Sequence, residues 1–323
     1  MTGGENIAFL FPGQGSQRVG MGKQLAALYP EAQETFEQAD SALGYKLSEV
    51  CFDGPESQLK LTEVTQPAIL TVSIAVLRVL RRNRIEAGYA AGHSLGEYSA
   101  HVAAGTMSFT DAVRLVRKRG QYMQEAVPVG IGTMAAVLGL PLATLEKICS
   151  EAAQSRICAP ANINSSDQVV ISGHTEAVER AAELAREQGA RRVVMLPVSA
   201  PFHCPLLEPA QKCMADDLSG VKFYPMKIPV VSNVDARLIY SPEHVREALT
   251  RQITAAVQWT KSMRTLIGRG VETFIEVGPG KVLCGLMRQI DPSKTCVNVE
   301  DEASLLAAVS QLRQAETATA SAA

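Results

Sequence analysis

The chain has 323 residues, of which 46% are hydrophobic and 20% are charged, so it can build one large domain or two modest ones. Its formal net charge of −2 argues against general binding of nucleic acid. The seven cysteines form no C-x-x-C pair and no metal-type spacing with histidine, which favours a reducing cytosol and no metal. The N-terminus has no signal-peptide pattern, and no uninterrupted apolar run is long enough to span a membrane.

The first predicted element is a buried strand over Ile7–Phe11, which ends at Pro12-Gly13-Gln14-Gly15. A helix is expected from about Met21 to Tyr29. The pattern of a dinucleotide-binding loop fails here because Arg18 stands where the third glycine should be. We therefore expect the loop to approach another site, with the N–H of Gln14 as a candidate oxyanion donor. An ordinary turn is the alternative.

The second predicted strand, Tyr89–Ala91, leads into Gly92-His93-Ser94-Leu95-Gly96 and an alanine-rich helix. This G-x-S-x-G pattern is typical of a nucleophile elbow, a sharp turn between a strand and a helix that exposes a serine hydroxyl. Glycine is needed on both sides because a side chain would strike the neighbouring strand or helix. Ser94 is therefore the candidate nucleophile, and a tight turn without a function is the alternative.

The middle of the chain differs from the rest. Between Thr133 and Val198 the predicted order is strand, helix, strand, strand, helix, strand, which is the order of a ferredoxin-like unit. On both sides of this unit strands alternate with helices, which indicates a mostly parallel sheet covered on both faces. We therefore predict an α/β fold with a large subdomain (residues 1–128 and 199–315), an inserted α+β small subdomain (129–198) and a disordered tail (316–323).

A serine nucleophile needs a base, and His203 is the best placed of the five histidines. It lies in the loop Pro201-Phe202-His203-Cys204-Pro205, directly after a strand, where open α/β sheets place catalytic residues. His93 shares the turn of Ser94, so its side chain is expected to point elsewhere, and His101 is expected to be a packing or surface residue. No convincing acidic residue lies between Ser94 and His203, so a backbone carbonyl is the expected partner of the imidazole.

These motifs resemble those of the malonyl-CoA:acyl-carrier-protein transacylases, which belong to the acyltransferase family of fatty acid and polyketide synthesis. The resemblance extends from about Ile7 to about Arg313, and the motifs follow the family's order. They are Pro12–Gln17, Gly92–Glu97, Arg119, Pro201–Pro205, Ser232–Val234, Val257–Thr260 and Glu276–Gly280.

The resemblance implies an α/β-hydrolase-like large subdomain, an inserted ferredoxin-like subdomain and a site in the cleft between them. It implies that Ser94 is the nucleophile, that His203 is the base and that Arg119 binds the malonyl carboxylate. The family's oxyanion donors match the backbone N–H groups of Gln14 and Leu95.

The remaining site residues also come from the resemblance. The backbone carbonyl of Gln252 matches the group that orients the histidine, so Gln252→Ala is expected to keep much of the activity. Phe202, Met123 and Asn162 are expected to line the substrate pocket. A guanidinium binds a carboxylate through two parallel hydrogen bonds, so Arg119 should exclude acetyl groups.

The implied activity is transfer of malonyl from malonyl-CoA to the phosphopantetheine thiol of acyl carrier protein, for fatty acid synthesis. A malonyl-serine intermediate carries the acyl group, and no cofactor or metal is permanently bound. We expect a cytoplasmic monomer that binds neither nucleic acid nor membrane. A serine hydrolase or thioesterase, an acyltransferase serving a polyketide synthase and a non-enzymatic carrier-protein scaffold are the alternatives. Arg119 and the missing acid argue against the hydrolase, and an intact Ser94 and His203 argue against the scaffold.

Overall fold

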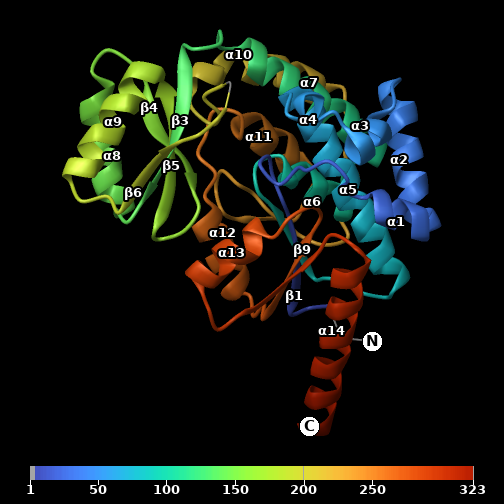
Figure 1. Ribbon diagram of the computed structural model, residues 1–323. Coiled ribbons are helices and arrows are strands. Elements are labelled where there is room, and N and C mark those ends of the chain that lie inside the picture. The colour runs from blue at the N-terminus through green and yellow to red at the C-terminus, as the bar shows by residue number, and fades with distance from the viewer. Residues whose placement is uncertain (1–3, 199, 323) are drawn as a thin grey trace.

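A parallel β-sheet organises the larger part of the molecule, seen in a computed structural model that describes residues 4–198 and 200–322 (Figure 1). Residues 1–3, 199 and 323 lie outside the described part. The predicted large subdomain begins its two segments at residues 1 and 199, and the predicted tail ends at residue 323, so these three positions are not described. Before the small subdomain the elements are β1 (Ile7–Phe11), α1 (Lys23–Leu28), α2 (Pro30–Leu43), α3 (Leu47–Asp53), α4 (Glu56–Leu59), α5 (Thr62–Arg82), β2 (Tyr89–Gly92), α6 (Gly96–Ala103) and α7 (Phe109–Glu125). After it come the 3-10 turn η1 (Pro205–Leu207), α10 (Glu208–Ser219), β7 (Val230–Val231), β8 (Leu238–Ile239), α11 (Glu243–Arg251), α12 (Trp259–Ile267), β9 (Thr273–Val277), α13 (Val282–Ile290), β10 (Thr295–Val299) and α14 (Glu302–Ala322).

The strand order of this sheet is β10-β9-β1-β2-β7-β8. All its pairings are parallel except that of β7 with β8. Phe11 at the end of β1 is in register with Gly92 at the end of β2. The loops that follow these two strands therefore leave the same edge of the sheet side by side, which is where open α/β sheets bind ligands.

Side chains of β1 alternate between two cores because successive residues of a strand point to opposite faces. Phe9 and Phe11 pack with α5 and its neighbours, whereas Ala8 and Leu10 pack with Trp259 and the helices of the other face. Helix α5 is long and apolar enough to cross a membrane, but 89% of its apolar window is buried inside the protein. It is the central helix of the larger core.

The small subdomain contains β3 (Gly132–Leu138), α8 (Leu142–Ala153), β4 (Cys158–Ile163), β5 (Gln168–His174), α9 (Thr175–Glu187) and β6 (Arg192–Met195). Its antiparallel sheet has the order β4-β5-β3-β6, and α8 and α9 pack against one face (Figure 1). The other face carries Met134, Ala136, Ala161 and Val170, beside Phe202. This arrangement confirms the predicted fold class, and the exact boundaries at 128/129 and 198/199 stay predictions.

The structure differs from the sequence-based prediction at the C-terminus. Helix α14 continues to Ala322, through the segment 316–322 for which a disordered tail is predicted. This segment is rich in alanine and contains no glycine or proline that would end a helix.

Candidate active site

Ser94 lies on the turn between β2 and α6, with a left-handed backbone φ of 52°. Such a conformation is strained for a residue other than glycine and persists only where the surroundings enforce it. A Cβ on Gly92 would overlap the backbone of Gly96, and a Cβ on Gly96 would overlap the carbonyl of Phe11. The predicted nucleophile elbow is therefore confirmed as a structural element, and its two glycines are needed for close backbone approach.

The imidazole of His203 joins Ser94 to Gln252. The Ser94 Oγ lies 2.7 Å from His203 Nε2, and His203 Nδ1 lies 2.8 Å from the backbone carbonyl of Gln252. A carbonyl can only accept, so Nδ1 carries the hydrogen and Nε2 is free to accept the serine proton. Burial, together with the nearby charge of Arg119, lowers the pKa of His203 to about 3, which keeps the ring neutral at neutral pH.

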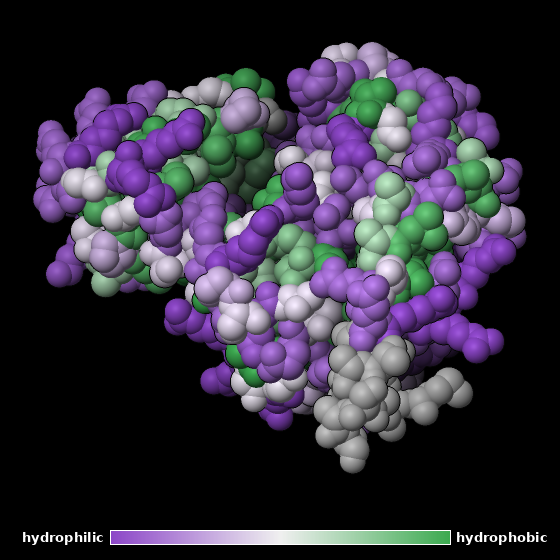
Figure 2. Space-filling model, turned by 60° about the horizontal axis from the view of Figure 1, so that its bottom comes forward, coloured by the Kyte–Doolittle hydropathy of each residue, from purple (hydrophilic) through white to green (hydrophobic). Residues whose placement is uncertain are grey.

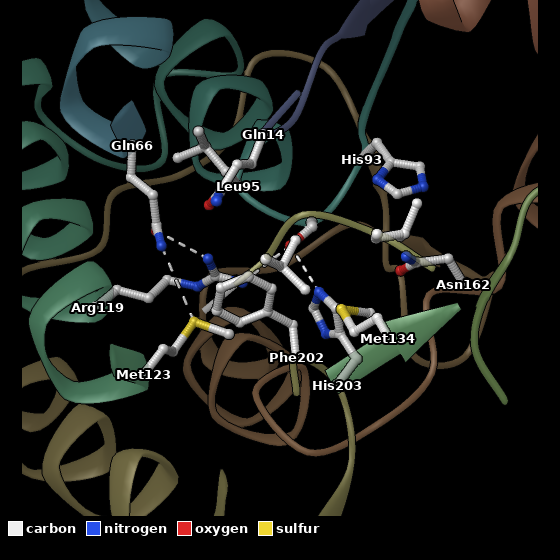
Figure 3. A pocket seen from close by; sticks show the side chains of 13 residues that line it. Gln14, Gln66, His93, Leu95, Arg119, Met123, Met134, Asn162, Phe202 and His203 are labelled. Carbon is white, nitrogen blue, oxygen red and sulfur yellow. Dashed lines mark hydrogen bonds between the residues drawn. The ribbon is translucent and has the colours of Figure 1, made fainter. Parts of the chain in front are cut away.

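Arg119 on α7 reaches the same point from the opposite side (Figure 3). Its side chain is 1% exposed, and its Nη2 donates to Ser94 Oγ at 3.1 Å and to Gln252 Oε1 at 2.9 Å. Nη1 donates to Gln66 Oε1 at 2.8 Å, and the guanidinium lies 5.7 Å from the centre of the Tyr98 ring. The buried Nε–H has no hydrogen-bond partner among the described residues. Burial lowers the pKa of the guanidinium, which nevertheless remains the cation of the site.

The loop after β1 brings Gln14 into the lining of this pocket, beside Leu95 (Figure 3). Among the described residues neither backbone N–H donates a hydrogen bond to another protein group. A Cβ on Gly13 would strike the His93 carbonyl, which explains the glycine in this loop. The side chain of Gln14 is held by Thr62, whose hydroxyl donates to its Oε1 at 2.8 Å.

The pocket is lined by every predicted site residue except Gln252, which contributes from behind His203 and Arg119. Met123, Phe202 and Asn162 all face it, as the sequence predicts (Figure 3). The lining residues that sequence reasoning missed are Gln66, His93, Met134, Leu196 and Val198.

The sequence analysis assigned no catalytic role to His93 or His101, and the structure shows where both side chains lie. His93 does direct its Nε2 toward Asn164, with 2.8 Å between Nε2 and Oδ1, but its ring still forms part of the pocket wall. His101 is fully buried on α6 and is therefore a packing residue.

From the pocket a larger groove extends between the two subdomains. Gln14, His93 and Asn162 line both the pocket and the groove. Figure 2 shows this hollow between the two lobes, with hydrophobic surface inside it. A long, thin substituent can therefore pass from solvent to Ser94.

The side chains of Asn233, Gln252 and Glu97 form a buried polar network against the elbow, and sequence reasoning assigned no role to these side chains. Asn233 accepts from the Ser94 N–H and donates to the Gly92 carbonyl, both at 2.7 Å. Gln252 Nε2 donates to the Ser94 carbonyl at 2.9 Å and to Glu97 Oε2 at 2.6 Å. Gln252 therefore contacts the site through its side chain as well as through the backbone carbonyl that the sequence-based prediction considered.

A serine, a neutral histidine and a buried guanidinium thus converge on one pocket. A family model described as an acyl transferase domain matches residues 8–320. The chain belongs to the acyl transferase family.

The malonyl CoA-acyl carrier protein transacylase of Escherichia coli K12 is 48% identical over 304 residues, which are 94% of this chain and 98% of that protein. The solved structure of the malonyl CoA-acyl carrier protein transacylase from Coxiella burnetii matches with a TM-score of 0.94 and 43% identity, over 96% of this chain and 98% of that one. A malonyl-transacylase solved in complex with a type II PKS acyl-carrier protein matches with a TM-score of 0.93 and 44% identity, over 95% and 99% of the two chains.

Proposed function

We propose that this enzyme transfers malonyl groups from malonyl-CoA to the phosphopantetheine thiol of acyl carrier protein, for fatty acid synthesis, through a malonyl ester on Ser94. The observation that carries the proposal is a buried guanidinium whose Nη2 lies 3.1 Å from the Ser94 hydroxyl oxygen. An acyl group bound there needs a carboxylate to pair with Arg119, because an unpaired buried charge is strongly unfavourable. Malonyl has such a carboxylate two carbons from its thioester.

In the first half-reaction Ser94 Oγ attacks the thioester carbon while its proton moves to Nε2 of His203. The resulting imidazolium is stabilised by the Gln252 carbonyl, which accepts from Nδ1–H at 2.8 Å. The N–H groups of Gln14 and Leu95 hold the oxyanion, and each such donor typically contributes about 3 kcal/mol. When the tetrahedral intermediate collapses, the C–S bond breaks and His203 gives its proton to the departing CoA thiolate.

In the second half-reaction the phosphopantetheine thiol of the carrier protein takes the place of CoA. His203 accepts the thiol proton, the sulfur attacks the ester carbon, and Ser94 leaves with the proton that His203 returns. The groove between the subdomains gives the extended phosphopantetheine arm a path to Ser94. The sequence of two displacements gives ping-pong kinetics.

The cellular location, the lack of membrane association and the oligomeric state are also part of the proposal. Free thiols at all seven cysteines support a cytoplasmic enzyme, and the burial of α5 supports one that does not enter the membrane. We propose a monomer, and light scattering at working concentrations measures its mass directly.

Mass spectrometry of the intact protein tests the activity. After mixing with malonyl-CoA we expect a malonyl adduct on Ser94, which disappears when phosphopantetheinylated carrier protein is added and reappears on that carrier. Ser94→Ala is the control and should acquire no adduct. Release of free malonate at the transfer rate without carrier protein would instead support a hydrolase, and no adduct at all would refute the proposal.

A further inference from the structure

Glu97 is a fully buried carboxylate three residues after Ser94, in the first turn of α6. Its Oε2 accepts the backbone N–H of Asn233 at 3.2 Å and the side-chain Nε2 of Gln252 at 2.6 Å. Its Oε1 has no hydrogen-bond partner among the described residues. The proposed chemistry does not use this group, although both of its partners contact Ser94.

The position of Glu97 determines how the Gln252 amide is oriented. An amide has a donor end and an acceptor end, whereas a carboxylate only accepts and a guanidinium only donates. Gln252 lies between Glu97 and Arg119, so its Nε2 must face Glu97 and its Oε1 must face Arg119. The reverse orientation would set oxygen against oxygen and N–H against N–H.

We propose that Glu97 is a positioning residue for acyl selectivity: its carboxylate orients the Gln252 amide, which in turn holds the Arg119 guanidinium beside Ser94. Nη2 of Arg119 donates to both Gln252 Oε1 and Ser94 Oγ. The Gln252 oxygen whose orientation depends on Glu97 therefore holds the same nitrogen that contacts the nucleophile. Glu97 itself is not among the described residues that line the pocket. This inference rests on the proposed malonyl transfer. It adds Glu97 as the residue that positions Arg119 to bind the malonyl carboxylate.

The charged and titratable groups around Glu97 come from several elements. Arg119 on α7 attracts it, Asp235 after β7 repels it, and Tyr98 lies next to it on α6; His203 lies beyond Arg119. Burial outweighs the hydrogen bonds from Gln252 and Asn233 and raises the pKa of Glu97 to about 7. Below that pH the protonated carboxyl is a weaker acceptor for Gln252, so malonyl transfer should fall to a lower plateau.

Glu97→Gln is the first test variant because it keeps the shape and an acceptor oxygen but removes the charge. We expect kcat/KM for malonyl-CoA to fall about 10- to 100-fold, since small misplacements of a binding group cost this much, and acetyl-CoA to change by less than about threefold. The variant should also stay on the lower plateau across the pH range in which the wild type rises.

Glu276→Gln is a matched control. Glu276 is also fully buried, accepts two backbone N–H groups, from Leu283 at 3.0 Å and Cys284 at 2.8 Å, and has its pKa raised by burial to about 7. It lies on β9, away from the pocket lining. We expect this control to keep the wild-type ratio of malonyl to acetyl transfer and the wild-type pH step.

A double-mutant cycle separates positioning from general damage. If Glu97 acts through Gln252, Glu97→Gln should lower malonyl kcat/KM by less than about twofold in a Gln252→Ala background. Equal losses for malonyl and acetyl, or fully additive losses in the cycle, would overturn the inference while wild-type labelling of Ser94 still stood. Absence of wild-type labelling would instead overturn the proposed function.

Discussion

Removal of the Arg119 guanidinium should destroy the preference for malonyl while leaving the acyl-transfer machinery in place. Arg119→Ala should leave the contacts from Ser94 to His203 and from His203 to the backbone carbonyl of Gln252 in place, because Arg119 takes part in neither. Ser94 Oγ and Gln252 Oε1 each lose one hydrogen bond that Arg119 donates. The variant therefore tests what the guanidinium contributes to malonyl selectivity.

The magnitude follows from the donors that Arg119 presents. A malonyl carboxylate bound by two charge-assisted hydrogen bonds gains about 1.5–3 kcal/mol from each, so the variant should lose about 3–6 kcal/mol. At about 1.4 kcal/mol per tenfold, kcat/KM for malonyl-CoA should fall about a hundred- to ten-thousand-fold. Acetyl transfer should stay constant or rise, because a buried cation no longer faces a methyl group.

Truncation also has a cost that both substrates share. The side-chain amide oxygens Oε1 of Gln66 and Gln252 lose the Arg119 donors that lie at 2.8 Å and 2.9 Å. A buried polar group left unsatisfied destabilises a protein by about 1–3 kcal/mol. Thermal unfolding measures this cost, and Arg119→Lys restores the charge without the bidentate geometry. The assay is the rate of Ser94 acylation by each thioester, and equal losses for malonyl and acetyl would refute the carboxylate-binding role.

Three further predictions follow from single contacts. Gln252→Ala should lower malonyl kcat/KM about a hundredfold, because its side chain is 1% exposed and bridges Arg119 to Glu97, and wild-type kinetics would contradict the network. The pKa of His203 is lowered to about 3, so this base stays neutral in moderately acidic solution. Acylation of Ser94 in the Glu97→Gln variant should therefore persist well below about pH 6.5, the ordinary pKa of histidine. A complete loss of acylation there would contradict the lowered pKa of His203. The sulfur atoms of Cys284 and Cys296 lie 2.6 Å apart, so we expect diamide to oxidise the two thiols to a disulfide, taking up both thiol hydrogens and being reduced to its hydrazine. Peptide mass spectrometry detects this disulfide, and Cys284→Ser is the control that cannot form it.

The elbow was predictable because its constraints are local. Two glycines, a serine and a following helix within Gly92–Gly96 define one turn, and the turn fixes the backbone of the serine. The βαββαβ order of the small subdomain was predictable for the same reason, since each element carries its own period of hydrophobic residues.

Short elements with few hydrophobic residues were not predicted. Helix α11 has nine residues and buries only Val245, Ala248 and Leu249. These three residues recur at helical spacing, but a single such group is too short a signal to identify a helix.

The polar network under the elbow could not be predicted from spacing. Glu97, Asn233 and Gln252 come from three separate segments, and the direction of the Gln252 amide depends on what lies at both of its ends. The motifs around Glu97 and Asn233 were visible in the sequence, but a motif does not show which atom accepts and which donates. Only the assembled fold reveals that the side chain of Gln252 matters as well as its carbonyl.

The position of Arg119 near His203 indicates that the enzyme also selects for malonyl in the rate of the acylation step, and not in substrate binding alone. The positive charge of Arg119 is the second cause, after burial, of the lowered pKa of His203. A malonyl carboxylate paired with Arg119 cancels much of that charge, so it raises the proton affinity of the base that must accept the Ser94 proton. An acetyl group leaves the charge unpaired and the base weak. We therefore expect single-turnover acylation at saturating thioester to be slower for acetyl than for malonyl in the wild type, and this difference in rate should shrink in Arg119→Ala. A wild-type preference that resides in KM alone would contradict the coupling between Arg119 and His203.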